Sequence, residues 1–348
     1  MSRPTAATPR PGAATSLPAA PAPHPAGAVS RRAVARAATA VGLTALLGAR
    51  TAAARASTGR TAPARAATSR AVTRVGPRTL DVSVTSPALG RSAPLRLILP
   101  SDFDARPDRS YPVLYLLHGA HDDYTSWTRE TDIESFTEGR QLIVAIPDAG
   151  PTGIPTDWRS GPDYETFQVE EVPALLARDY RASGARAVAG VSTGGYGAMA
   201  HAARHPGRYA AAASYSGILD TTAPGVPPIV DAIVARENLL PRTLWGNPLL
   251  NPLTWRDFNP RARAAGLRGT SLYVSSGSGV AGGSGDWLPE ALESALWPSA
   301  HAFTDTLALL GVPVTAHYYP GGGHSWTYWK REFTASWPML ARGLGVPE

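Results

Sequence analysis

The feature that most constrains the fold of this chain is a serine between two glycines, Ser192 in the Gly-x-Ser-x-Gly sequence of residues 190–194. An apolar, β-leaning run over 185–191 precedes it, and a helical pattern over 194–204 follows it. At a sharp turn from strand to helix, a serine is held in a strained conformation that only small neighbours tolerate, and its hydroxyl projects above the sheet. We therefore predict a nucleophile at Ser192; a tight turn with a capping serine is the alternative.

The alternation of strand and helix continues on both sides of this motif. Most of the apolar runs are typical of strands that are covered on both faces, as in a parallel sheet. The sequence predicts an α/β-hydrolase fold, with a mostly parallel central sheet, helices on both faces and an inserted cap region over 221–266. The expected strands are 79–85 and 95–99, which form a hairpin at the antiparallel edge, then 112–117, 141–147, 185–191, 209–214, 271–275 and 314–318; the expected helices are 167–180, 194–204, 288–310 and 325–342.

A histidine near the C-terminus is the expected general base. His324 follows three glycines directly after the last expected strand, so a flexible loop can bring its imidazole to Ser192. The N–H of Thr193 lies beside the start of the next helix, where unpaired amides favour a developing oxyanion. The loop after strand 112–117 supplies the second oxyanion donor, for which we choose the N–H of Ala120.

Other histidines compete for a functional role. His118 and His121 flank Ala120 and are predicted either to contact substrate or to line a polar rim. His201 and His205 have the spacing of a helical metal-ligand pair, but no third ligand is near them, so we expect solvated histidines. The chain has no cysteine, which excludes thiolate nucleophiles and disulfides. We therefore expect neither a metal site nor a cofactor.

The first 78 residues differ in composition from the rest. Residues 1–29 are rich in Ala, Pro and Ser without periodicity, which is typical of disorder. Arg31 and Arg32, a short apolar run over 37–49 and small residues ending at Ala56 resemble a twin-arginine export signal; an accidental arginine pair is the alternative. The run is too short to span a bilayer, so no integral membrane segment is expected after processing. We predict an export signal over 1–56, a linker over 57–78 and a catalytic domain over 79–348, in a secreted or cell-envelope protein.

Charge is unevenly distributed along the chain. The formal net charge is +6, but residues 1–80 contain twelve arginines and no acid, so residues 81–348 carry −6. Binding to phosphates of nucleic acid needs a basic surface on the folded domain. We therefore expect no nucleic-acid partner, and instead a small-molecule, lipid or carbohydrate ester as substrate. Nothing in the sequence specifies an oligomeric state.

Short motifs are distributed between residues 95 and 344. They are Leu116-Leu117-His118-Gly119 with Asp122-Asp123-Tyr124 and Trp127, Asp157-Trp158, Glu165-Thr166-Phe167, the turn at Ser192, Trp245-Gly246, and His324-Ser325-Trp326-Thr327-Tyr328-Trp329. Together they resemble the esterase D and antigen 85 superfamily, which includes bacterial esterases, feruloyl esterases and mycolyltransferases. The histidine motif is the most diagnostic of them.

This resemblance also indicates the acidic partner of His324. In the antigen 85 branch the acid is a glutamate on a helix after a glycine-rich loop, and Glu293 is the matching position. A carboxylate there would hold the histidine tautomer and stabilise the imidazolium. Asp286 is the rival because it lies nearer the end of strand 271–275, and a solvated helix carboxylate is the third interpretation of Glu293. Asp148, Asp157 and Asp305 rank behind these.

Three functions are compatible with these residues. The first is hydrolysis of carboxylic esters through an acyl-enzyme on Ser192. The second is transfer of the same acyl group to a sugar or alcohol; mycolyltransferases carry an Asp before the glycine of the oxyanion loop for the sugar acceptor, where this chain has His118. The third is a non-catalytic surface protein that binds carbohydrate or lipid, which a complete Ser, acid and His set disfavours. Tryptophans are predicted to line a groove or to fill the core, namely Trp158, Trp245, Trp255, Trp287 and Trp326.

Overall fold

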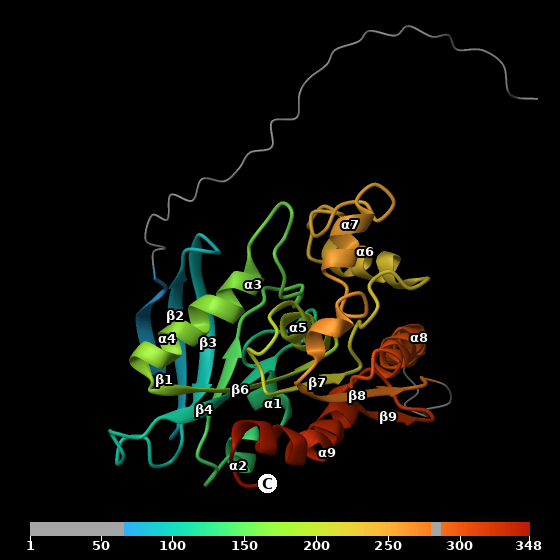
Figure 1. The fold of residues 1–348 in the computed structure, drawn as a ribbon. Coiled ribbons are helices and arrows are strands. Elements are labelled where there is room, and N and C mark those ends of the chain that lie inside the picture. Colours follow the sequence, from blue (N-terminus) through green and yellow to red (C-terminus); the bar gives the residue numbers. More distant parts are fainter. Residues whose placement is uncertain (1–65, 280–286) are drawn as a thin grey trace, which may run out of the picture. The chain divides into compact units, whose positions relative to one another are not determined.

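Nine strands form one sheet within the residues that the computed structural model describes, which are 66–279 and 287–348 (Figure 1). The strand order is β1-β2-β3-β5-β4-β6-β7-β8-β9. The strands from β5 to β9 in this order are parallel, and β3, β2 and β1 extend the sheet as antiparallel neighbours. The strands are β1 (Thr68–Arg74), β2 (Thr79–Ser86), β3 (Arg91–Ile98), β4 (Tyr111–Leu117), β5 (Ile143–Pro147), β6 (Ala182–Val191), β7 (Ala211–Tyr215), β8 (Ser271–Gly277) and β9 (Thr315–Tyr319).

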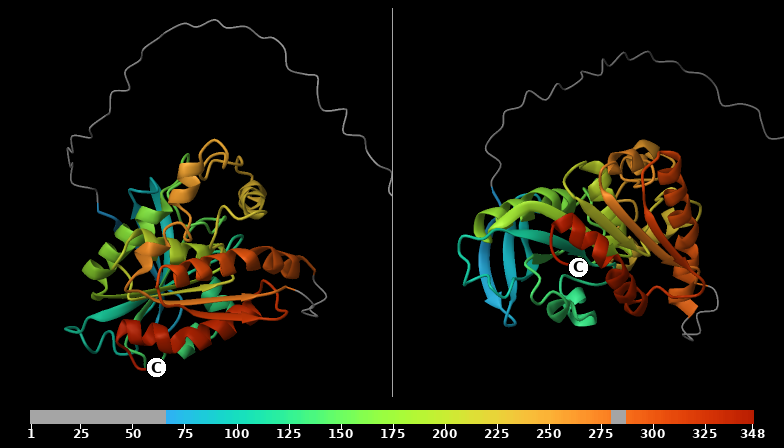
Figure 2. Two further views of the ribbon diagram at one scale, coloured as in Figure 1. Left: turned by 45° about the vertical axis from the view of Figure 1, so that its right-hand side comes forward. Right: turned by 60° about the horizontal axis from the view of Figure 1, so that its bottom comes forward.

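Each face of the sheet supports its own apolar core, because successive side chains of a strand point to opposite faces. In β4, Val113 and Tyr115 belong to one buried cluster, and Leu114 and Leu116 belong to the other. Helices α4, α5 and α8 pack on the first face, and α1, α2 and α9 pack on the second; the left view of Figure 2 shows α8 (orange) above the sheet and α9 (red) below it. The predicted fold, a mostly parallel sheet with helices on both faces, is confirmed.

The predicted elements recur with small shifts. The hairpin of β2 and β3 pairs Thr79 with Ile98, as expected for the antiparallel edge. The helix expected over 167–180 is divided, because Pro173 has no N–H to continue the ladder and the turn before it widens into a π-helix. The helices are α1 (Ser126–Glu130), α2 (Ile133–Phe136), α3 (Tyr164–Thr166), the π-helix η1 (Phe167–Glu171), α4 (Val172–Asp179), α5 (Thr193–Arg204), α6 (Val226–Arg236), α7 (Pro252–Asp257), the 3₁₀-helix η2 (Ala264–Leu267), α8 (Trp287–Leu309) and α9 (Trp326–Leu344).

The linker expected over 57–78 is wrong in its C-terminal part. Strand β1 lies there and pairs with β2, with Val72 opposite Val82 and Arg74 opposite Leu80. Residues 71–74 of this edge strand are all exposed, with Val72 at 51%, so the strand has no buried apolar face. The alternation that identified the other strands is therefore absent from β1. The export signal predicted over 1–56 lies outside the described residues.

The segment expected as an insertion, 221–266, lies between β7 and β8 and holds α6, α7 and η2. Both α-helices have a proline in the first turn, where the missing N–H costs nothing. Two tryptophans of this segment, Trp245 and Trp255, are buried and meet edge to face, with ring centroids 5.0 Å apart. Over the described part of the chain, none of the helices is both long enough and apolar enough to cross a bilayer.

Candidate active site

Ser192 occupies the turn between β6 and α5 with φ 54° and ψ −121°, a region that residues with side chains rarely adopt. The turn is held because the Ser192 N–H donates to the carbonyl of Tyr215 at 2.9 Å, and the Tyr196 N–H donates to the carbonyl of Ser192 at 3.0 Å. A Cβ on Gly190 would lie 2.2 Å from the carbonyl oxygen of Gly194. The small neighbours that the sequence places around Ser192 are therefore required by the turn itself.

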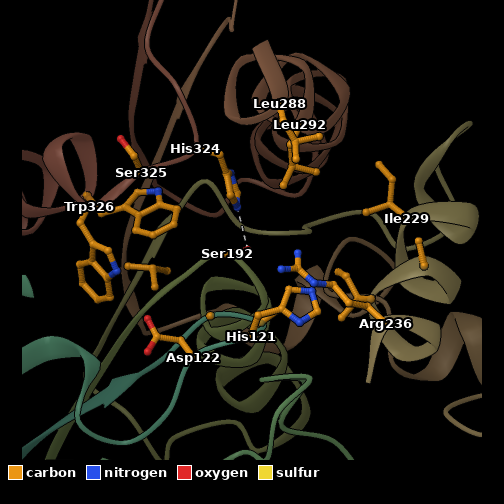
Figure 3. A pocket seen from close by; sticks show the side chains of 16 residues that line it. His121, Asp122, Ser192, Ile229, Arg236, Leu288, Leu292, His324, Ser325 and Trp326 are labelled. Atoms are coloured by element: carbon orange, nitrogen blue, oxygen red, sulfur yellow. Dashed lines mark hydrogen bonds between the residues drawn. The ribbon is translucent and has the colours of Figure 1, made fainter. Parts of the chain in front are cut away.

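Three residues that are distant in the sequence form one hydrogen-bonded chain at the carboxyl edge of the sheet. His324 Nε2 lies 2.8 Å from Ser192 Oγ, and His324 Nδ1 lies 2.8 Å from Glu293 Oε2 (Figure 3). An ionised carboxylate only accepts, so Nδ1 carries the proton and Nε2 accepts from the serine hydroxyl. This is the arrangement that activates a serine for nucleophilic attack. The structure thus brings together the nucleophile, base and acid that the sequence predicts.

Glu293 is completely buried, and the carboxylate oxygen that does not contact His324 accepts hydrogen bonds from three other groups. Oε1 accepts hydrogen bonds from the Ser216 hydroxyl at 2.8 Å, the Ser276 hydroxyl at 3.0 Å and the Gly277 N–H at 2.7 Å. Burial alone would raise the pKa of Glu293, but the hydrogen bonds from His324, Ser216 and Gly277 outweigh it and lower that pKa. The interpretation of Glu293 as a solvated carboxylate is wrong. Its rival Asp286 lies outside the described residues.

Ser216 and Trp329 also hold the side chains of Glu293 and His324 in place, and neither role was predicted from the sequence. The Trp329 indole N–H donates to Ser216 Oγ at 3.1 Å, and its ring meets the His324 ring edge to face at 5.0 Å. The His324 N–H donates to the carbonyl of Pro289 at 3.1 Å, which ties the histidine loop to the helix that carries Glu293. Ser216 directly follows a parallel strand, and that position at the carboxyl edge was the signal available in the sequence.

The N–H groups predicted as oxyanion donors belong to Ala120 and Thr193. Thr193 begins α5, so its N–H has no acceptor within the helix. Within 66–279 and 287–348, neither N–H is paired with another backbone group. Ala120 also lines the cavity that contains Ser192. Both groups are therefore available for an external acceptor beside the serine.

His118 is fully buried, so neither role predicted for it is correct. The Ala149 N–H donates to its Nε2 at 2.9 Å, and its Nδ1 therefore donates to the carbonyl of Gly119, also at 2.9 Å. Both ring nitrogens are used inside the protein, and the ring fixes the loop that carries Ala120. His121 does line the cavity, where it is paired with Glu237.

Both histidines of the helical pair have hydrogen-bond partners within the protein. His201 is buried and hydrogen-bonds the carbonyl of Pro155 at 2.8 Å through Nε2, and burial lowers its pKa. His205 and Arg204 contact the same oxygen of Glu165, at 2.7 and 2.8 Å. Burial would raise the pKa of Glu165, but these partners lower it to about 2. The expected solvation is thus wrong for His201, and the described residues contain no group of three side chains suited to a metal.

A cavity of about 620 Å³ opens above Ser192. Figure 3 shows Leu288, Leu292 and Ile229 on one side of the serine and Trp326 on the other. Arg236, His121 and Asp122 supply polar groups to the cavity wall and lie below the serine in this view. Of the tryptophans considered from the sequence, Trp326 lines this cavity, Trp158, Trp245 and Trp255 are buried in the core, and the side chain of Trp287 lies outside the described residues.

Comparison with known proteins assigns the chain to a family. The family model named Esterase matches residues 86–340. The chain belongs to the Esterase family. The predicted esterase D and antigen 85 superfamily is confirmed, and so is the prediction that the chain belongs with serine esterases and their acyltransferase relatives.

Two relatives illustrate the range of this family. Esterase Rv1288 of Mycobacterium tuberculosis is 31% identical over 252 residues, which are 68% of this chain and 53% of that protein. The chain thus spans about half the length of that relative. The diacylglycerol acyltransferase/mycolyltransferase Ag85B of Mycolicibacterium smegmatis is 29% identical over 282 residues, which are 75% of this chain and 84% of that protein.

Solved structures support the fold of this chain. MPT51 of Mycobacterium tuberculosis aligns with a TM-score of 0.64 and 24% identity, over 75% of this chain and 97% of that one. An S-formylglutathione hydrolase from Agrobacterium tumefaciens aligns with a TM-score of 0.61 and 18% identity, over 79% and 98% of the two chains. At these identities the likeness shows the fold alone.

Proposed function

We propose that this esterase hydrolyses carboxylic esters through an acyl-enzyme on Ser192, with His324 as general base and Glu293 as its acidic partner. The observation that carries the proposal is the unbroken chain of two 2.8 Å hydrogen bonds from Ser192 through His324 to Glu293. Family membership supports the ester as substrate class. None of the proposed steps needs a metal or an organic cofactor.

In the first half-reaction, Ser192 Oγ attacks the ester carbonyl carbon while its proton passes to His324 Nε2. The carbonyl π electrons move to oxygen, and the N–H groups of Ala120 and Thr193 stabilise that oxyanion. Collapse of the intermediate breaks the bond to the alcohol, which leaves with the proton from Nε2. The imidazolium that forms transiently is stabilised by the ionised Glu293.

In the second half-reaction, water attacks the acyl-enzyme, and His324 Nε2 takes its proton. Collapse of the second tetrahedral intermediate releases the acid and returns the proton to Ser192. Apolar walls beside Ser192, formed by Ile233 and Leu292 among others, favour an acyl or aryl group without charge at this point.

Water is the acceptor that the geometry favours over a sugar. A transferase must orient the acceptor hydroxyl well enough to outcompete water. The position where mycolyltransferases carry an Asp is His118, which is buried and has both ring nitrogens paired. The nearest carboxylate on the cavity wall, Asp122, is bound by Arg129 at 2.8 Å.

We therefore expect free acid to dominate the products from a short-chain p-nitrophenyl ester, even with millimolar glucose, trehalose or glycerol present. Mass spectrometry of free acid and acylated alcohol measures this partition. The Asp122→Asn variant serves as control, and its partition should match that of the unchanged protein. If acylated sugar dominates at millimolar acceptor, the enzyme is a transferase and the hydrolase proposal is wrong.

We also propose that the protein is exported through Arg31 and Arg32 as a twin-arginine signal, which rests on the sequence of residues 1–56 alone. Replacing both arginines with Lys in the native host is expected to retain the protein in the cytoplasm, as cell fractionation would measure. Arg36→Lys, a matched change in the same segment, should leave secretion intact. Equal secretion of all three proteins would make the arginine pair incidental.

A further inference from the structure

An exposed set of leucines lies on the segment that connects α6 to α7 and on the first turn of α7. A monomeric protein normally exposes large apolar side chains singly, and a concentration of them marks an interaction site. Here several occur within residues 239–253. Their exposed fractions are 41% for Leu239, 76% for Leu240, 87% for Leu249, 80% for Leu250 and 73% for Leu253.

Buried side chains of the same segment fix its backbone and so keep exposed leucines on its outer side. Leu244, Trp245 and Trp255 of the same stretch are buried. The Trp255 indole N–H donates to the carbonyl of Gly246 at 3.0 Å, and Phe258 stacks on the Trp245 ring at 5.8 Å. Because these inward side chains fix the backbone, Leu249, Leu250 and Leu253, which lie between Trp245 and Trp255 in the sequence, are held outward.

Arginines accompany the leucines. Residues 236–256 contain Arg236, Arg242 and Arg256, all of them exposed, and one acid, Glu237. Glu237 is paired with His121, and within the described residues none of the three arginines forms an ion pair. The segment therefore presents apolar side chains together with uncompensated positive charge.

The segment is continuous with a wall of the active-site cavity. Ile229, Ile233 and Arg236 of α6 line that cavity, and Leu239 follows three residues after Arg236. In Figure 1 and in the left view of Figure 2, the connection between α6 and α7 projects away from the sheet. The connection that carries Leu239, Leu240, Leu249 and Leu250 thus extends outward from the sheet.

We propose that residues 236–256 form a docking surface for an anionic lipid interface. Leucines of this surface enter the boundary between headgroups and acyl chains, and its arginines bind phosphate oxygens beside them. A second copy of the chain fits less well, because a two-fold contact would bring the same uncompensated arginines together. The inference concerns docking, so it does not depend on the chemistry proposed for Ser192.

The absence of cysteine from the sequence allows a direct test. In the full chain, Leu250→Cys labelled with an environment-sensitive nitrobenzoxadiazole dye should show a several-fold rise in emission with vesicles of phosphatidylcholine and phosphatidylglycerol. The same label on Leu309→Cys is the control, since Leu309 is 88% exposed on α8, outside the docking surface. Equal responses at both positions, or none at position 250, would overturn the proposal. So would an emission change that follows protein concentration without vesicles, which would assign the surface to a second copy.

Vesicle cosedimentation tests the side chains themselves. The double change Leu249→Ser and Leu250→Ser should weaken binding by about 10- to 100-fold, whereas Leu309→Ser should not. Arg242→Gln and Arg256→Gln should each weaken it about fivefold, whereas the exposed Arg106→Gln should not. The arginines of residues 1–80 are the same in all variants, and a thermal melt close to that of the unchanged protein shows that each variant folds. If the leucine variants bind as tightly as their control, the docking surface is elsewhere.

Discussion

Replacement of Ser192 with Ala is expected to abolish covalent labelling by a fluorophosphonate probe and to lower kcat for p-nitrophenyl esters by about 10⁴- to 10⁶-fold. The probe forms a bond to an activated serine oxygen, and the hydroxyl that His324 Nε2 contacts at 2.8 Å is removed in this variant. Hydrolysis through an acyl-enzyme has no alternative route once that oxygen is absent. Any activity that remains would come from binding and from the oxyanion donors acting on water.

Labelling followed by intact-protein mass spectrometry and initial rates under saturating ester provide the measurements. Ser325→Ala is the matched control. Ser325 lines the same cavity and neighbours His324, but it takes no part in the hydrogen bonds that join Ser192, His324 and Glu293. It should label at the rate of the unchanged protein. Undiminished labelling of Ser192→Ala would assign the nucleophile to another residue and end the proposed mechanism.

The parts of this fold that sequence reasoning predicted are those with a strong local signal. Strands β4 to β8 have apolar runs, and the turn at Ser192 is specified by glycines, because a Cβ at Gly190 or Gly194 would clash with neighbouring backbone atoms. Strand β1 was not predicted because it lies at the open edge of the sheet and consists mainly of Thr, Ser and Arg. Helices α6 and α7 were not predicted because their sequences contain prolines, which terminate a helical pattern except in the first turn.

The residues of the candidate site also fall into those that the sequence predicts and those that it does not. Ser192 and His324 could be predicted from motif and chain order, and Glu293 from the family resemblance. The hydroxyls that bind Glu293 could not be predicted, because Ser216 follows β7 and Ser276 is the penultimate residue of β8. Only the parallel register of these neighbouring strands brings them to one carboxylate. The burial of His118 likewise depends on how the loop after β5 packs over the loop after β4. Such contacts join residues that are distant in the sequence, so no local sequence pattern predicts them.

Glu293→Gln is expected to lower kcat by about 10³- to 10⁴-fold, with a much smaller change in KM. The reason is that every group that contacts Oε1 is a hydrogen-bond donor. Ser216, Ser276 and the Gly277 N–H all point at Oε1, so the glutamine oxygen must take that position. The amide nitrogen then faces His324 Nδ1 and donates to it. This places the histidine proton on Nε2, where it blocks acceptance of the serine proton.

Because the amide is nearly isosteric with the carboxylate, the variant should fold, and fluorophosphonate labelling should slow rather than disappear. Steady-state kinetics on a short-chain p-nitrophenyl ester measure the loss, and a thermal melt close to that of the unchanged protein excludes misfolding. Asp286→Asn is the comparison, and its kcat should stay within about threefold, because the Nδ1 atom of His324 already has Glu293 as its partner at 2.8 Å. If Asp286→Asn instead loses activity while Glu293→Gln keeps it, the acidic role belongs to Asp286. The buried carboxylate of Glu293 would then serve only to join α8 to the ends of β7 and β8.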